Sequence, residues 1–327
     1  MTTFAQSVYE TVSFPVINRP VRRVAFGCEP LGGYNWGGVD PEEIAAAASE
    51  AISSGPILLD TADCYGPNAS EVRLGEVLEQ CADAKRNAVI ATKFGVRVVD
   101  GSVFYDNDPG YADQALDASL ARLRINKIDL YQLHWPDAKT PLPKIFAKLE
   151  TFREEGRIGA YGVSNIPAST LSEFKPNEWP GLASFSLSYS LIDRKQEKSI
   201  DRLMQTHGLA FIAFGCLAQG LLSGKYGRDT VFPENDRRRH QRYSAFHGSE
   251  LESNLEIVDA LMVEAKSLGQ APTAIALSMI LRKFPNSIAL AGIKSRSQLR
   301  QNLTALESKL TLKSLERLLN ASDKNAG

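Results

Sequence analysis

Short apolar runs alternate with longer amphipathic segments along almost the whole chain. Each apolar run is bounded by polar or glycine-containing turns, which is typical of buried strands, and the segments between them carry apolar residues at helical spacing. Strands are predicted at residues 21–27, 56–60, 87–93, 127–134, 158–163, 182–187, 209–214 and 287–291. Helices are predicted between them at 44–53, 69–81, 113–124, 142–155, 167–174, 196–206 and 297–306.

This alternation predicts the fold class. Successive strand–helix units predict an α/β protein with a parallel sheet. Eight such units, with no shift in composition between them, predict a closed (β/α)8 barrel of the TIM type, as a single domain over residues 1–327. Val12, Phe14 and Val16 alternate with polar residues and indicate an N-terminal hairpin that closes the bottom of the barrel. Extra helices are expected towards the C-terminus, at 251–267, 272–283 and 312–321.

Two polar loops interrupt the regular alternation. Residues 97–111 form an insertion after the third strand, and we expect it to cover the mouth of the barrel. Residues 215–249 form a longer loop after the seventh strand. This loop contains Arg237, Arg238 and Arg239, which we interpret as a solvated surface.

Polar residues follow several of the predicted strands at equivalent positions. Asp60 ends the second strand and Tyr65 follows it, Lys93 ends the third strand, and His134 ends the fourth. Each of them alone is most simply a turn former or a structural residue. In a barrel of this type, however, the carboxyl ends of the strands meet at the face that carries the chemistry. The sequence therefore predicts that these four side chains share one site.

Composition narrows the classes of function. The chain has 43% hydrophobic and 23% charged residues and a formal net charge of -1, which indicates a globular protein without a general affinity for nucleic acid or a membrane surface. We expect neither a signal peptide nor a membrane span. Four scattered cysteines are interpreted as free thiols in the cytoplasm. The four histidines show no paired spacing, so no metal site is expected.

The chain resembles the aldo-keto reductase family over nearly its whole length. The segments that carry the resemblance are LLDTADCYG (58–66), SEVRLGEVL (70–78), VIATKFG (89–95), KIDLYQLHWPD (127–137), GRIGAYGVSN (156–165), LAQGLLSGKY (217–226) and GIKSRSQLRQN (292–302). This family consists of (β/α)8 barrels that reduce carbonyl groups with NADPH and without a metal. The resemblance implies a catalytic tetrad of Asp60, Tyr65, Lys93 and His134, with NADP(H) as the cofactor.

Each tetrad residue has a role that its chemistry allows. Reduction by hydride requires a proton donor for the developing alkoxide, and the resemblance gives this role to Tyr65. Because a phenol has a pKa near 10, we expect the Lys93 ammonium to lower the pKa of Tyr65. Asp60 is expected to hold Lys93 by a charge-assisted bond, and His134 to orient the substrate oxygen.

The resemblance also implies a set of cofactor-binding residues. They are Cys28, Asp60, Ser164, Asn165, Ser186, Phe214, Leu217, Gln219, Gly220, Lys225, Gly292, Lys294, Ser295, Gln298 and Asn302. Ser186 replaces the glutamine that is usual in the family, Phe214 replaces a tyrosine, and Gly215-Cys216 replaces a common Ser-Pro pair. Taken without the resemblance, the segment from Lys294 is a plain helix start with a solvated lysine.

The substrate pocket and the direction of reaction remain open at this point. Tyr34, Trp36, Phe94 and Trp135 lie on loops at the catalytic end and are expected to line the pocket, and Asp63 either binds a hydroxyl or caps a turn. The leading prediction is NADP-dependent reduction of an aldehyde or ketone to an alcohol, and the expected partner is a small carbonyl compound or sugar. The alternatives are a sugar dehydrogenase working oxidatively with NAD or NADP, a nucleotide-sensing regulatory subunit, and a metal-dependent hydrolase, and the protein is either a monomer or a homo-oligomer.

Overall fold

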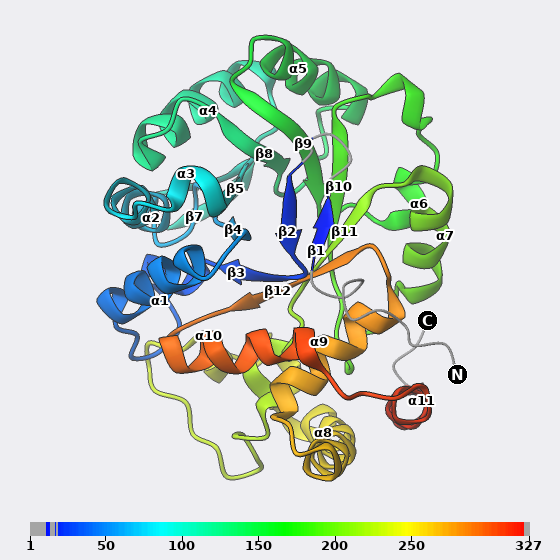
Figure 1. The fold of residues 1–327 in the computed structure, drawn as a ribbon. Coiled ribbons are helices and arrows are strands. Elements are labelled where there is room, and N and C mark those ends of the chain that lie inside the picture. The colour runs from blue at the N-terminus through cyan, green and yellow to red at the C-terminus, as the bar shows by residue number, and fades with distance from the viewer. Residues whose placement is uncertain (1–10, 14–16, 18, 324–327) are drawn as a thin grey trace.

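Eight parallel strands close into a barrel in the computed structural model, which describes residues 11–13, 17 and 19–323. Around the barrel they are β3 (Val24–Gly27), β4 (Ile57–Asp60), β5 (Ala88–Phe94), β8 (Ile128–Leu133), β9 (Ile158–Ser164), β10 (Leu182–Ser188), β11 (Ala210–Phe214) and β12 (Ser287–Gly292). β12 pairs with β3 and completes the circle. Figure 1 shows these strands enclosed by a ring of helices. The predicted single-domain (β/α)8 barrel is confirmed.

Helices cover the outside of the barrel. They are α1 (Pro41–Ser53), α2 (Ala69–Gln80), α3 (Ala84–Asn87), α4 (Pro109–Leu123), α5 (Leu142–Glu154), α6 (Ala168–Leu171), α7 (Glu197–His207), α8 (Gly248–Leu268), α9 (Pro272–Lys283), α10 (Arg296–Leu303) and α11 (Leu312–Ala321). α1 begins at Pro41, earlier than the predicted residue 44, because the Asp40 carboxylate accepts hydrogen bonds from the backbone amides of Glu42 and Glu43. The helix predicted at 167–174 is shorter than expected, since α6 is a single turn.

The apolar side chains form two cores on opposite faces of the strands. Small and branched residues such as Ala25, Leu58 and Val89 fill the barrel interior, while a larger cluster lies between the strands and the helices. The bottom of the barrel is closed by the antiparallel hairpin of β1 (Thr11–Ser13) and β2 (Pro20–Arg22), whose Val12 and Val21 join the interior cluster. The predicted hairpin is therefore present, although Phe14 and Val16 lie outside the described residues.

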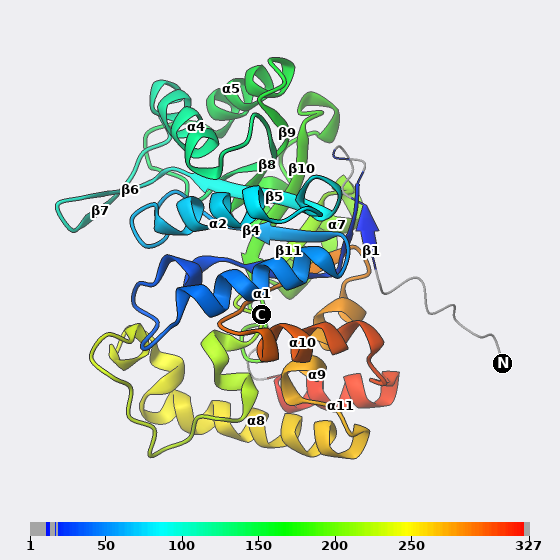
Figure 2. The ribbon, with the colours of Figure 1, turned by 60° about the vertical axis from the view of Figure 1, so that its left-hand side comes forward.

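The insertion after β5 does not cover the barrel mouth, and that prediction is wrong. Its strands β6 (Val96–Val99) and β7 (Ser102–Tyr105) pair as an antiparallel hairpin that extends outward (Figure 2). Four consecutive exposed residues in β7 show that this hairpin lies in solvent rather than on the barrel. It reaches the site only at its end, where Tyr105 stacks on Trp135 with ring centroids 5.7 Å apart.

The basic run in the long loop is also not a solvated surface. It forms the short helix η5 (Arg237–Arg239), in which only Arg239 is exposed. Arg238 is 5% exposed and donates to both carboxylate oxygens of Asp236, at 2.9 and 2.6 Å. Its guanidinium also lies over the Phe232 ring, 4.6 Å from the centroid. A paired, flat guanidinium can be buried against aromatic rings, which the pattern of charges alone does not reveal.

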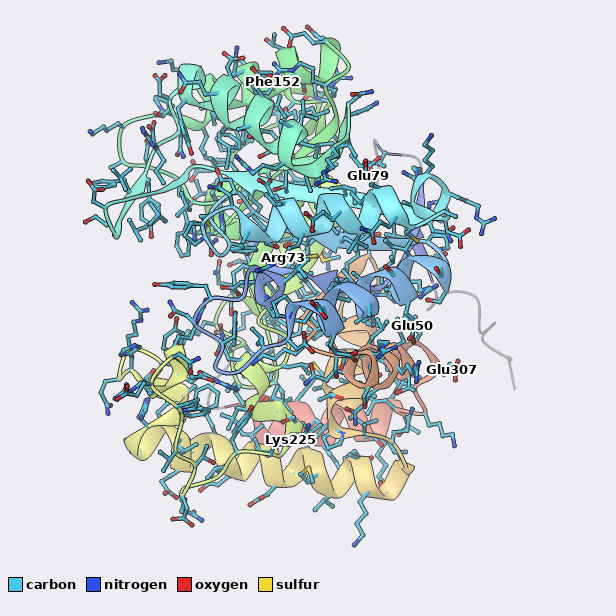
Figure 3. All side chains as sticks on the ribbon, turned by 90° about the vertical axis from the view of Figure 1, so that its left-hand side faces the viewer. Glu50, Arg73, Glu79, Phe152, Lys225 and Glu307 are labelled. Carbon is cyan, nitrogen blue, oxygen red and sulfur yellow. The ribbon has the colours of Figure 1, made fainter. Side chains whose placement is uncertain are left out.

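The loop that carries Tyr65 packs tightly against the helix η2 (Glu29–Gly32). A Cβ atom on Gly66, whose φ is +59°, would lie 2.2 Å from the backbone oxygen of Gly32. Arg73 of α2, which Figure 3 labels, also holds this helix by donating to the Leu31 carbonyl at 2.6 Å. The position of Tyr65 therefore depends on the absence of a side chain at residue 66.

Gly66→Ala is expected to lower the free energy of unfolding by more than about 2 kcal/mol, because backbone strain and a clash with main-chain atoms add together. Gly101→Ala is the matched control. Gly101 also has a positive φ, of +78°, but no atom lies within 4 Å of its added Cβ. Urea unfolding of both variants measures the difference, and equal losses would show that the packing against η2 contributes nothing.

Candidate active site

One cavity of about 560 Å³ opens at the carboxyl ends of the barrel strands. Asp60 at the end of β4, Tyr65 in the loop after it, Lys93 in β5 and His134 after β8 all line this cavity. The structure thus brings together the four polar residues predicted from their positions at strand ends.

A buried ion pair lies at the base of the cavity. The Lys93 Nζ atom is 2.5 Å from Asp60 Oδ1 and donates a second bond to the Thr61 carbonyl at 2.9 Å. The other oxygen of Asp60 accepts from Gln132 Nε2 at 3.1 Å, and Gln132 Oε1 accepts from Ser186 Oγ at 3.0 Å. Both carboxylate oxygens of Asp60 are therefore satisfied, and the chain of bonds fixes the lysine.

The Tyr65 hydroxyl lies 3.4 Å from Lys93 Nζ. Burial raises the pKa of Tyr65 well above its ordinary value near 10, and the negative charges of Glu29 and Asp60 raise it further. The expected lowering of this pKa by Lys93 is not found. The physical reason is that burial penalises the phenolate more than the ammonium favours it, since Asp60, 2.5 Å from Lys93 Nζ, offsets part of that positive charge. Tyr65 consequently remains a protonated phenol, which is the form that can donate a proton.

His134 packs edge-on against Tyr65, with ring centroids 5.7 Å apart. Burial lowers the pKa of His134 well below 6.5, and the positive charge of Lys93 lowers it further, so the imidazole is neutral. Its Nδ1 atom is 3.7 Å from the Sγ atom of Cys64. Asn165 Nδ2 donates to the His134 carbonyl at 2.9 Å and fixes the backbone here. A neutral imidazole facing the cavity can orient an oxygen by hydrogen bonding.

The same cavity continues from the tetrad past β9, β10 and β11 to the start of α10. The expected cofactor residues that line it are Asp60, Ser164, Asn165, Ser186, Phe214, Leu217, Gln219, Gly220, Lys225, Gly292, Lys294, Gln298 and Asn302. Two expected residues do not line it. Cys28 is fully buried in the core, where burial raises the pKa of its thiol. Ser295 instead caps α10, its Oγ accepting from the Gln298 amide at 3.2 Å.

The substrate-binding prediction is partly wrong. Trp36 and Trp135 line the cavity, but Phe94 does not, because it is fully buried and stacks on Tyr131 at 4.8 Å in the outer core. The reason is strand alternation: Lys93 points into the barrel, so the next residue points out of it. Tyr34 is 58% exposed and also lies outside the cavity lining. Applying the two-residue period would have excluded Phe94 from the sequence alone.

Asp63 does not line the cavity either. It is 6% exposed, and its Oδ2 atom accepts a hydrogen bond from the Tyr111 hydroxyl at 3.4 Å. Burial and the charge of Glu71 raise the pKa of the Asp63 carboxyl to about 7. Of the two roles considered for Asp63, binding a substrate hydroxyl does not follow from this placement, whereas its hydrogen bond to the backbone of Cys64 in the same turn fits the capping role.

Several cationic side chains meet around Trp36 at the edge of the cavity. The sequence pattern alone interprets them as solvated. Lys294 Nζ donates to the Trp36 carbonyl at 2.7 Å and lies 5.2 Å from the centre of its ring. Arg237 stacks on the same ring at 4.6 Å, and Arg238 lies nearby. Burial and the charge of Arg238 lower the pKa of Lys294 to about 8. Lys294 is therefore not the solvated lysine of a plain helix start.

These features fit a nicotinamide dinucleotide. The cavity offers hydroxyl and amide groups near the tetrad, the Phe214 ring on β11, and cations at its other end. The family resemblance marks Lys294, whereas Glu29, Arg237 and Tyr243 line the cavity from loops that are far apart in the sequence, and no sequence signal marks them. Within the described part of the chain, no group of three or more His, Cys, Asp or Glu residues is arranged to hold a metal ion. No helix there is long and apolar enough to cross a membrane.

Lys93→Met is expected to lower the free energy of unfolding by about 3–5 kcal/mol, because it leaves the Asp60 carboxylate buried without a cation. The double variant Lys93→Met with Asp60→Leu removes both charges and should recover much of that loss. Urea unfolding followed by circular dichroism measures both. If the double variant is no more stable than the single one, the lost stability does not come from the unpaired carboxylate.

Comparison with known proteins agrees with this geometry. The family model "Aldo/keto reductase family" matches residues 23–323. The curated aldo-keto reductase YhdN of Bacillus subtilis is 29% identical over 279 residues, which are 85% of this chain and 82% of that protein. The aldo-keto reductase yakc [NADP(+)] of Schizosaccharomyces pombe is 28% identical over 94% of this chain and 90% of its own length.

Solved structures show the same similarity. The glycerol dehydrogenase AKR11B4 from Gluconobacter oxydans has a TM-score of 0.87 and 32% identity, covering 97% of this chain and 96% of that one. The aldo-keto reductase AKR11C1 from Bacillus halodurans, in its holo form, has a TM-score of 0.75 and 26% identity, covering 96% of each chain. The chain belongs to the aldo/keto reductase family, and it is an NAD(P)H-dependent oxidoreductase that acts on carbonyl and alcohol groups.

Proposed function

We propose that this protein reduces a small aldehyde or ketone to the alcohol with NADPH, and that Tyr65 is the proton donor. The observation that carries the proposal is the placement of the Tyr65 hydroxyl 3.4 Å from Lys93 Nζ, in a cavity that also reaches Lys294. A bound nicotinamide dinucleotide supplies the hydride that adds to the carbonyl carbon. The protein supplies the proton to the carbonyl oxygen from the Tyr65 phenol.

The other tetrad residues support this transfer. Neutral His134, facing the same cavity, orients the carbonyl oxygen towards Tyr65. Lys93 lies beside the Tyr65 hydroxyl and stabilises the negative charge that develops there as the proton leaves. Its charge has little effect on the resting phenol, because the resting phenol is neutral. Asp60, Gln132 and Thr61 keep Lys93 in place so that no reorganisation is needed during the reaction.

Oxidation of an alcohol is the second candidate, because the same groups catalyse both directions. It is favoured by one observation, the 32% identity to a structure named as a glycerol dehydrogenase. In that direction Tyr65 would accept the proton of the hydroxyl group. The complete tetrad, with Asp60 and Lys93 buried and bonded to each other, argues against a subunit that only senses nucleotide, since such a role does not require a proton donor.

We propose NADP rather than NAD as the cofactor. The support is the cationic environment of Lys294, together with the Ser295 cap and the start of α10, where backbone amides favour an anion. A relative with 28% identity carries NADP(+) in its name.

We also propose a cytoplasmic location. The four cysteines of this chain are unpaired, which is consistent with that location.

Tyr65→Phe is expected to lower kcat for carbonyl reduction by about 10²–10⁴-fold, because the general acid is lost, while the Kd for NADPH stays nearly unchanged. Tyr34→Phe removes a phenol outside the cavity and is the matched control. Steady-state rates and fluorescence titration of the cofactor measure both quantities. Wild-type turnover in Tyr65→Phe would reject the assignment of the proton donor.

Lys294→Met is expected to weaken NADPH binding by about ten- to a hundredfold at pH 7, since one charge-assisted contact is worth about 1.5–3 kcal/mol, and to leave NADH nearly unaffected. The wild type adds a pH test. Lys294 has a pKa of about 8, so it is cationic below that pH and neutral above it. Affinity for NADPH should therefore fall between pH 7 and pH 9 in the wild type and not in Lys294→Met. Parallel NADPH and NADH titrations with the same pH dependence would show that Lys294 does not contact the phosphate.

A further inference from the structure

The histidine of the tetrad has a side-chain partner that the proposed mechanism does not use. The Nδ1 atom of His134 lies 3.7 Å from the Sγ atom of Cys64, within the range of a hydrogen bond to sulfur. Cys64 directly precedes Tyr65 in the chain. Unlike His134 and Tyr65, however, Cys64 does not line the cavity. The thiol therefore contacts the imidazole from the wall of the site and leaves the cavity itself open to a substrate.

The backbone holds both partners of this contact in place. The amides of Asp63 and Tyr65, on either side of Cys64, each donate to a backbone carbonyl at 3.2 Å. The His134 amide donates to the Phe94 carbonyl at 2.9 Å. Because both segments are bonded to the barrel in this way, the sulfur and the ring nitrogen are held next to each other before any substrate binds.

Both groups are uncharged at neutral pH. Burial and then the charge of Asp63 raise the pKa of Cys64 to about 12, so its side chain remains a thiol. Burial and then the charge of Lys93 lower the pKa of His134 well below 6.5, so the imidazole carries a single ring proton. In a neutral imidazole one nitrogen donates and the other accepts, and the bond made by one sets the role of the other. The position of the ring proton therefore depends on what Nδ1 meets.

One assignment of protons matches both ring nitrogens and a carbonyl substrate. A carbonyl oxygen only accepts hydrogen bonds, so the ring nitrogen that faces it must carry the proton. Among the described residues Cys64 is the only side-chain partner of Nδ1, and none bonds to Nε2, which is left for the cavity. When the thiol donates to Nδ1, the ring proton lies on Nε2. In the opposite tautomer Nδ1 donates to sulfur, a weak acceptor, and the lone pair of Nε2 repels the carbonyl oxygen.

We propose that Cys64 is a positioning residue, whose thiol donates to Nδ1 of His134 and holds the imidazole in the tautomer with its proton on Nε2. His134 then presents a hydrogen-bond donor to the carbonyl oxygen without any rearrangement of protons when the substrate binds. The inference rests on the proposed function for the role of that oxygen, and it adds to it the residue that sets the protonation of the ring.

Nitrogen-15 spectra of the free protein test this inference, because the shifts of the two ring nitrogens report which of them carries the proton. The chain has four histidines, and the signal that is lost in His134→Gln belongs to His134. At pH 7 the wild type is expected to show only the Nε2–H tautomer at this residue. Cys64→Ala should show both tautomers, and Cys64→Ser, which restores a donor, should return the wild-type pattern. Cys64→Val is a second apolar variant in case Cys64→Ala does not fold.

Turnover is expected to change by the contribution of one hydrogen bond. Cys64→Ala should lower kcat for carbonyl reduction by about two- to tenfold and leave the Kd for NADPH unchanged, and Cys64→Ser should recover most of the loss. Cys81→Ala is the matched control, because Cys81 is also half-buried but lies outside the cavity lining, with its sulfur 3.8 Å from Ser53 Oγ. It should alter neither the spectrum of His134 nor kcat.

The possible failures are distinct. A wild type with the His134 proton on Nδ1, or with a mixture of tautomers, overturns the inference. Apolar variants whose His134 spectrum matches the wild type also overturn it, since residue 64 then only packs against the ring, and an equal loss of kcat in Cys64→Ser leads to the same conclusion. A wild type that reduces no carbonyl compound with either NADPH or NADH overturns the proposed function instead. It leaves the tautomer result intact, because the spectra are recorded without substrate.

Discussion

The buried ion pair between Lys93 and Asp60 is the interaction on which the rest of the site depends. Removing both charges from water is costly, and such a pair persists only when its geometry is good and its remaining bonds are satisfied. The barrel register provides this: Asp60 lies opposite Ala91 on β5, and Lys93 lies opposite Gln132 on β8. Three neighbouring strands thus supply the Asp60 carboxylate, the Lys93 ammonium and the Gln132 amide that bonds to the carboxylate. A shift of one residue in any of them would turn its side chain out of the barrel.

Charge is distributed unevenly along the cavity. At the reacting end the charges compensate, since Lys93 faces Asp60. Further along, burial and then the charge of Arg238 lower the pKa of Lys294 to about 8. This arrangement keeps the phenol neutral where a proton must be held and leaves positive charge where an anion would bind.

The sequence predicted the parts of this molecule that depend on local patterns. The strand and helix periods gave the barrel, and the tetrad followed because equivalent strand ends meet in space. Contacts between long loops have no period, so nothing in the sequence joins Glu29 to Arg237. The pKa of Tyr65 was predicted in the wrong direction for a related reason. This pKa depends on burial and on several charges together. The effect of Lys93 on it can be judged only from the structure, which places Asp60 2.5 Å from Lys93.

Ser186 shows how a departure from the family pattern is absorbed by the structure. A glutamine at this position on β10 would be long enough to reach into the cavity, whereas the serine hydroxyl is short and donates to Gln132 instead. Gln132 in turn donates to Asp60, which holds Lys93. Ser186 also lines the cavity, so it connects the cofactor side of the site to the ion pair. One chain of hydrogen bonds therefore connects the cavity wall at β10 to the buried ion pair at β4 and β5.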